Sequence, residues 1–175
     1  MEIFAEVLKY VLPAVTVLIG MYLVFKELRK KEEVVERYAL RSQALKQVIP
    51  LRLQAYERAI LFLERISPEN MILRLDTRNK NSRMLLIEIQ GEIRAEYEHN
   101  LAQQLYIEPA SWVEVVRAKE QVLALVNASA GKVPPEAPAA ELGKIIIGTL
   151  MNSEISPAHR SIAILKSDIN KMFRL

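Results

Sequence analysis

Residues 10–25 carry no charged side chain, and this uncharged run constrains the fold of the chain more than any other feature of the sequence. Tyr10 and Tyr22 lie near its two ends, where aromatic residues of membrane interfaces occur. At ~1.5 Å per residue the run spans ~24 Å, and extension back to Ile3 reaches the ~30 Å of a hydrocarbon core. The sequence therefore predicts a transmembrane anchor over residues 1–25.

Three other interpretations of this run are weaker. A cleaved signal peptide needs a basic start and a cleavage site, whereas this chain begins with Glu2 and Glu6, and Phe25 is followed by Lys26. An interfacial amphipathic helix needs a polar face, which the run lacks. A buried core helix remains possible, because short apolar runs form either structure.

A basic cluster follows the run directly and sets the predicted orientation. Its members are Lys26, Arg29, Lys30 and Lys31. Because positive residues concentrate on the cytoplasmic side, we expect a single-pass protein of the bacterial inner membrane with its C-terminal domain in the cytoplasm. The same four residues are candidate contacts for phosphate or anionic lipid headgroups.

The rest of the chain has the periodicity of helices. Apolar residues recur at three- and four-residue spacing, and no useful segment alternates as a half-buried strand would. We predict an all-α fold, in which one N-terminal transmembrane helix precedes a bundle of about six or seven helices. The expected divisions are a stalk helix (26–49), a helical core that begins where Pro50 breaks or restarts the helix (50–128), a linker (129–138) and a C-terminal helical pair (139–175).

The stalk helix carries an imperfect heptad pattern. With Leu28 at position a, apolar residues fill most a and d positions through Ile49, but Lys31 and Ser42 interrupt the seam. A dimeric coiled coil and a stalk that packs on its own domain both fit this pattern.

One motif is typical of metal sites. Glu96 and His99 form an E-x-x-H, and Glu92 lies one turn earlier. Di-iron bundles need two such motifs and two further glutamates, whereas the other histidine, His159, has no glutamate three residues before it. We therefore predict no metal and no cofactor. Glu92, Glu96 and His99 remain weak candidates, and an exposed acidic helix face is the simpler explanation.

A polar loop holds a second candidate site. The basic residues of this loop are Arg74, Arg78, Lys80 and Arg83. They could contact phosphate, either of RNA near a ribosome or of lipid headgroups. No aromatic residue is interleaved to stack on bases, so an ordinary exposed loop is the simpler interpretation.

Composition and motifs exclude several classes of enzyme. The chain has no cysteine, which removes thiol catalysis, disulfides and cysteine zinc sites. Its net charge of +3 is small for a nucleic-acid-binding domain. It contains no phosphate-binding glycine loop, G-x-S-x-G or H-E-x-x-H, so no catalytic residue is predicted. The glycine-flanked ridge at 143–148 could be core or an exposed binding face.

Three short segments carry a resemblance to a known family. The stretches IPLRLQAYER (49–58) and LFLERISP (61–68), with GKII at 143–146, resemble a family of uncharacterised single-span bacterial membrane proteins with a helical cytoplasmic domain. The resemblance implies a bacterial setting and a single span, and it brings no activity and no catalytic residues.

The sequence as a whole therefore predicts a non-enzymatic, membrane-tethered helical module that binds a protein partner or itself. Contact with RNA or a ribosome through residues 74–83 is the alternative. A metal-dependent enzyme built on the E-x-x-H helix is the second alternative.

Overall fold

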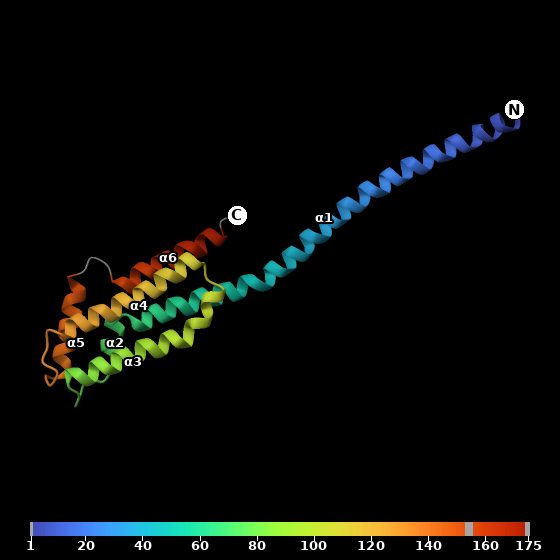
Figure 1. The fold of residues 1–175 in the computed structure, drawn as a ribbon. Coiled ribbons are helices and arrows are strands. Elements are labelled where there is room, and N and C mark those ends of the chain that lie inside the picture. The colour runs from blue at the N-terminus through green and yellow to red at the C-terminus, as the bar shows by residue number, and fades with distance from the viewer. Residues whose placement is uncertain (1, 153–155, 174–175) are drawn as a thin grey trace. The chain divides into compact units, whose positions relative to one another are not determined.

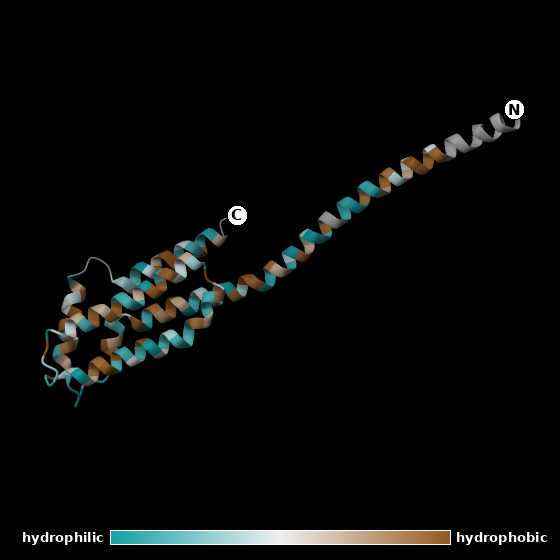
Figure 2. Ribbon diagram, viewed as in Figure 1, coloured by the Kyte–Doolittle hydropathy of each residue, from teal (hydrophilic) through white to brown (hydrophobic). Residues whose placement is uncertain are grey.

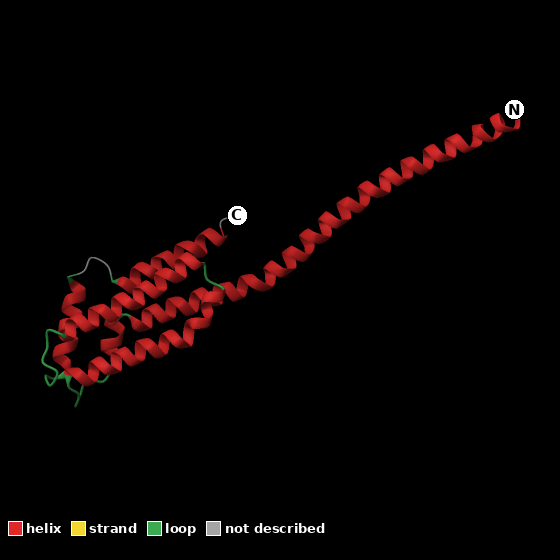
Figure 3. Ribbon diagram, in the orientation of Figure 1, coloured by secondary structure: helices red, strands yellow, loops and turns green. Residues whose placement is uncertain are grey.

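The computed structural model describes the backbone of residues 2–152 and 156–173, and the side chains of residues 15–32, 35–152 and 156–172. These residues form six α-helices and one 3-10 helix (Figures 1 and 3). Within them the only β pairing is an isolated bridge between Asn81 and Pro138. The all-α part of the fold prediction is confirmed. The chain divides into two compact units, Met1–Ile49 and Pro50–Leu175.

The first helix, α1 (Glu2–Ile66), contributes to both units. It continues through Pro50, so the expected break at this residue is wrong. A proline inside a helix removes one backbone hydrogen bond and costs ~3 kcal/mol. The turns that follow are held in the helix by burial of Ala55, Tyr56 and Ala59, all 0% exposed. Tertiary packing therefore outweighs the local preference.

The predicted transmembrane helix is wrong. Among the residues that the structure describes, no helix has both the length and the apolar character that crossing a bilayer requires. The described apolar side chains of this region, residues 15–25, extend over only ~16 Å of helix, about half of a hydrocarbon core. After this run charged residues resume at Lys26, and the side chains of residues 1–14 lie outside the described part. The predicted single pass through an inner membrane depended on this helix, and so did the orientation of the C-terminal domain. Neither is supported by the structure.

The second unit is a helical bundle. After α1 come α2 (Pro68–Arg74), α3 (Ser82–Asn100), a 3-10 turn (Leu101–Leu105), α4 (Pro109–Ala130), α5 (Ala139–Met151) and α6 (Pro157–Phe173). Pro68 and Pro109 stand in the first turns of their helices, where a missing N–H costs nothing. Asn81 caps α3, because its side-chain oxygen accepts a hydrogen bond from the Met84 N–H at 2.9 Å.

The core of this unit joins the end of α1 to α3, α4, α5 and α6. Its largest fully buried side chains include Tyr56, Phe62, Leu63, Ile66, Met71, Leu85, Ile89, Ile93, Val115, Leu142, Ile146 and Leu165. The Tyr97 ring lies 6.0 Å from Phe62 and 6.2 Å from Trp112, measured between centroids, and so links α1, α3 and α4. The Tyr56 hydroxyl accepts a hydrogen bond from the Glu108 N–H at 3.1 Å, which fixes the start of α4 against α1.

The loop before α5 is tied to the start of α3. The Ser82 N–H donates to the Ala137 carbonyl at 2.8 Å, and the Ala139 N–H donates to the Lys80 carbonyl at 3.0 Å. The ridge at 143–148 contributes to the core through Gly143 and Ile146, which are buried. The inner face of the ridge is therefore part of the core.

Candidate functional site

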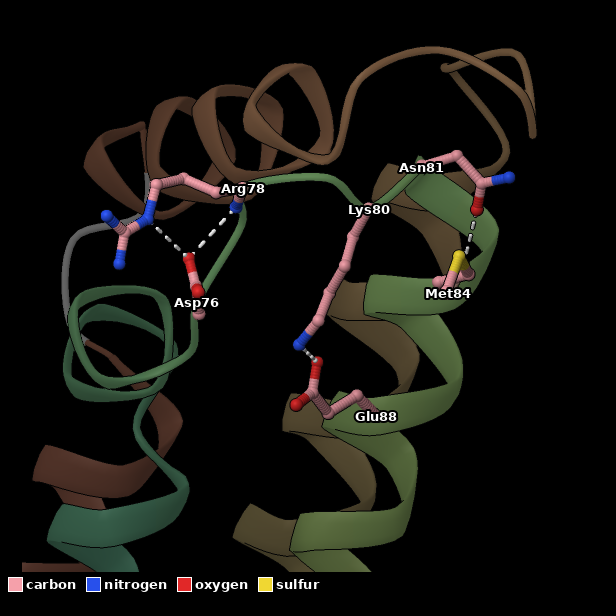
Figure 4. Close-up of polar contacts among 6 residues, drawn as sticks. All are labelled: Asp76, Arg78, Lys80, Asn81, Met84 and Glu88. Atoms are coloured by element: carbon pink, nitrogen blue, oxygen red, sulfur yellow. Dashed lines mark hydrogen bonds and ion pairs between the residues drawn. The ribbon is translucent and has the colours of Figure 1, made fainter.

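The acidic face of α3 is neutralised by three basic residues. Glu88, Glu92 and Glu96 follow at four-residue spacing, so they share one side of the helix. The ion pairs are Lys80 Nζ to Glu88 Oε2 at 2.5 Å (Figure 4), Arg74 to Glu92 at 3.4 Å, and Arg65 to Glu96 at 2.7 Å. We call these three pairs the α3 ladder. They connect α3 to the end of α1, to α2 and to the loop between α2 and α3.

The ladder bears directly on the candidate metal ligands. Glu92 and Glu96 each face an arginine, and His99 is exposed at the end of α3. Within the described residues no three histidine, aspartate or glutamate side chains are grouped as a metal site would require. A carboxylate that already accepts from a guanidinium is a poor starting point for cation binding, because the arginine charge repels the metal.

The loop of residues 74–83 carries paired rather than free cations. The Arg78 backbone N–H and Nε donate to Asp76 Oδ1 at 3.0 and 3.1 Å (Figure 4). These bonds hold the pKa of Asp76 below its ordinary value. The bond from the backbone N–H has the larger effect, and the bond from the guanidinium follows. Arg74 and Lys80 belong to the α3 ladder. Arg83 makes no ion pair among the described residues and lines a cavity of about 240 Å³.

A polar groove of about 280 Å³ lies between the end of α1 and α3. It brings Arg58, Arg65, Glu96 and His99 to one surface. Sequence reasoning identified the two α3 residues but missed both arginines, because Arg65 and Glu96 are far apart in the chain. A neighbouring cation has no local signal in the sequence. The groove can donate hydrogen bonds to an acidic side chain of another molecule. Its own carboxylate, Glu96, is already paired with Arg65.

The basic cluster on α1 is exposed throughout. Lys30 lies 3.8 Å from Glu27, with the two side chains 66% and 69% exposed. At about 100° per residue, Lys26, Arg29 and Lys30 point to one side of the helix and Lys31 to the other. The four cations therefore do not form one continuous patch.

Large apolar side chains are exposed along the remainder of this helix. Val24, Leu28, Val35, Tyr38 and Leu45 are exposed and Ile49 is half-buried; these six residues, which we call the α1 stripe, recur at three-, four- and seven-residue spacing. At about 100° per residue they fall within an arc of about 100°, the width of a helix face that packs on a partner. Val35 is 66% exposed and Tyr38 is 70% exposed. Figure 2 shows apolar and polar residues alternating along this part of α1.

The fold of the second unit is therefore a helical bundle, and the described part of α1 in the first unit carries exposed apolar side chains on one face. The chain belongs to a family of unknown function, DUF7935, which it matches over residues 2–172. The expected membership of an uncharacterised family is thereby confirmed, whereas the bacterial setting stays a prediction. No curated protein and no solved structure matches the chain significantly.

Proposed function

We propose that the chain is a non-enzymatic protein-interaction module, in which the α1 stripe binds a helix of another protein molecule. The observation that carries this proposal is the exposure of the stripe. Single exposed apolar residues are normal on a protein surface, but apolar residues that recur along one helix face, here interrupted at Lys31 and Ser42, mark a site of interaction. Burial of one such half-exposed side chain contributes about 1 kcal/mol.

The form of the surface supports a helical partner. The stripe is narrow and follows one helix, so a partner helix lying alongside covers it with the fewest additional residues. Most side chains on the opposite face, such as Arg29, Glu36 and Gln47, are charged or polar and suit contact with water, with exposed Leu40 as an exception. Isolated helices are marginally stable in water, so an extended helix gains order from a partner.

Two other functions have less support. Contact with RNA or a ribosome through residues 74–83 is opposed by the carboxylate partners of Arg74, Arg78 and Lys80. RNA binding that weakens with salt and with Arg83→Ala would favour this alternative. Metal-dependent chemistry on α3 would require the ladder to open, and a rise in Tm on adding Zn²⁺ or Mn²⁺ would favour it.

Site-specific photo-crosslinking in native cells tests the proposal. A photoreactive amino acid replaces Leu45 in the stripe, and Gln47 serves as the matched control, because it is exposed but lies about 200° around the helix. We expect an adduct of defined mass from position 45 and none from position 47. Absence of an adduct at position 45, or equal adducts at both positions, would contradict a partner on the stripe.

A further inference from the structure

We infer that the helix bound by the α1 stripe is the same segment of a second copy of this chain, paired antiparallel, with Leu28 of each copy opposite Leu45 of the other. This inference rests on the proposed function and specifies its partner. It uses only residues 24–49, all of which lie in the first unit.

Two polar residues that share the helix face of the α1 stripe determine the register of the two paired helices. Lys31 and Ser42 occupy heptad positions d and a, where apolar residues are otherwise found. In an antiparallel pair, an a residue of one helix faces a d residue of the other. The register that places Leu28 opposite Leu45 also places Lys31 opposite Ser42, since both pairs are symmetric about the same point. Each polar residue thus meets the other.

Every remaining layer of this register is apolar. The facing residues are Val24 with Ile49, Leu28 with Leu45, and Val35 with Tyr38, each occurring twice by symmetry. Sliding the helices by one heptad places Lys31 against Val35 or against Ile49 and buries a charge beside an apolar side chain. A parallel pair in register places Lys31 against Lys31 of the other copy, which is also unfavourable.

The charged residues that flank the stripe favour the same orientation. Glu27 and Arg41 occupy position g on one edge, and Glu32 and Lys46 occupy position e on the other edge. In a parallel coiled coil, g of one helix faces e of the next heptad in its partner. That arrangement places Glu27 against Glu32 and Arg41 against Lys46, so both contacts are repulsive.

Reversal of one helix exchanges its edges, so that g faces g and e faces e. Glu27 then faces Arg41 of the second copy, and Glu32 faces Lys46. Both contacts become attractive, and each spans the same two core layers as in a parallel pair. Within its own chain Glu27 makes a long ion pair with Lys30, at 3.8 Å, and its side chain is about two-thirds exposed. Such a pair is weak, so Glu27 can exchange Lys30 for a residue of the second copy. Orientation and register are therefore both specified by residues of one segment.

A charge substitution distinguishes the two orientations. Arg41→Glu places glutamate against Glu27 in the antiparallel pair, but against Lys46 in a parallel one. We expect Arg41→Glu to raise the Kd of dimerisation of the full chain about tenfold in sedimentation equilibrium, and Glu27→Arg with Arg41→Glu to restore it. A Kd that falls or does not change on Arg41→Glu would overturn the inference.

Disulfide trapping provides an independent test, because the chain has no cysteine of its own. Leu28→Cys and Leu45→Cys variants, one carrying a mass tag, are oxidised alone and mixed. The inference predicts a mixed disulfide and little product from either alone, because the two Leu28 positions lie about 26 Å apart in the antiparallel pair, beyond disulfide reach.

Each other outcome has a separate meaning. Efficient trapping of Leu28→Cys alone would show a parallel pair and overturn the orientation. A monomer that yields no disulfide would exclude the second copy. If position 45 still gave an adduct with a different protein in cells, the proposed function would stand while the present inference failed.

Discussion

The α3 ladder allows a quantitative prediction about how the bundle is held together. Each ion pair is removed in a double-mutant cycle, with Gln replacing the carboxylate residue and Met replacing the basic one. Lys166→Gln is the control, since Lys166 is exposed and makes no ion pair among the described residues. The cycle isolates the coupling between the two side chains from the effect of each substitution alone.

The expected couplings follow from distance and exposure. The Lys80–Glu88 pair is short, at 2.5 Å, and its side chains are 25% and 34% exposed, so we expect about 1 kcal/mol. Arg65–Glu96 combines a 58% exposed arginine with a 15% exposed glutamate, and we expect about 0.5 kcal/mol. Arg74–Glu92 is longest, at 3.4 Å, and both partners are more than 40% exposed, so about 0.2 kcal/mol is expected.

Urea unfolding at low salt and in 1 M NaCl measures these couplings. The predicted order is Lys80–Glu88, then Arg65–Glu96, then Arg74–Glu92, and each value should fall at high salt because exposed charges are screened. A coupling for Arg74–Glu92 that equals or exceeds that of Lys80–Glu88 would refute the reasoning from burial. So would couplings that are independent of salt.

Two further predictions concern single contacts. Tyr56→Phe leaves the Glu108 N–H without its partner, and we expect the free energy of unfolding, measured thermally, to fall by about 1–3 kcal/mol. Tyr106→Phe is the control, because this ring is partly exposed, and it should change stability by less than about 0.5 kcal/mol. The bonds from Arg78 favour ionised Asp76 in the folded chain, so their contribution is present above the unfolded pKa and lost as pH falls through the lower folded pKa. The Arg78 amide signal in NMR should therefore titrate below the ordinary aspartate range, and a midpoint within or above that range would contradict this.

Much of the helical bundle could be predicted from local signals. Prolines at the starts of α2 and α4, and the polar loop before α3, mark boundaries that need no tertiary information. The end of α3 at Asn100 has no comparable local signal; there the backbone tightens into the 3-10 turn Leu101–Leu105. Leu105, at the end of this turn, is 78% exposed.

The errors arise where distant contacts or context decide. An apolar run such as residues 10–25 is compatible with several environments, and hydropathy alone does not distinguish them. Pro50 has a strong local preference that the packing of Tyr56 outweighs. The pairing of Arg74 with Glu92 has no local signal in the sequence, because the two residues meet only through the fold. The heptad pattern of residues 26–49 is visible in the sequence, and its role in binding a partner stays a prediction.

Amide hydrogen exchange of residues 24–49 in the purified full chain tests the central claim most directly. A lone helix opens readily, whereas a paired one is protected by the contacts that opening would break. The account predicts that exchange in this segment slows as protein concentration rises, with protection lost in Leu28→Ser/Leu45→Ser while the bundle of residues 50–173 is unaffected. Fast exchange at every concentration, equal in the wild-type chain and the variant, would contradict it.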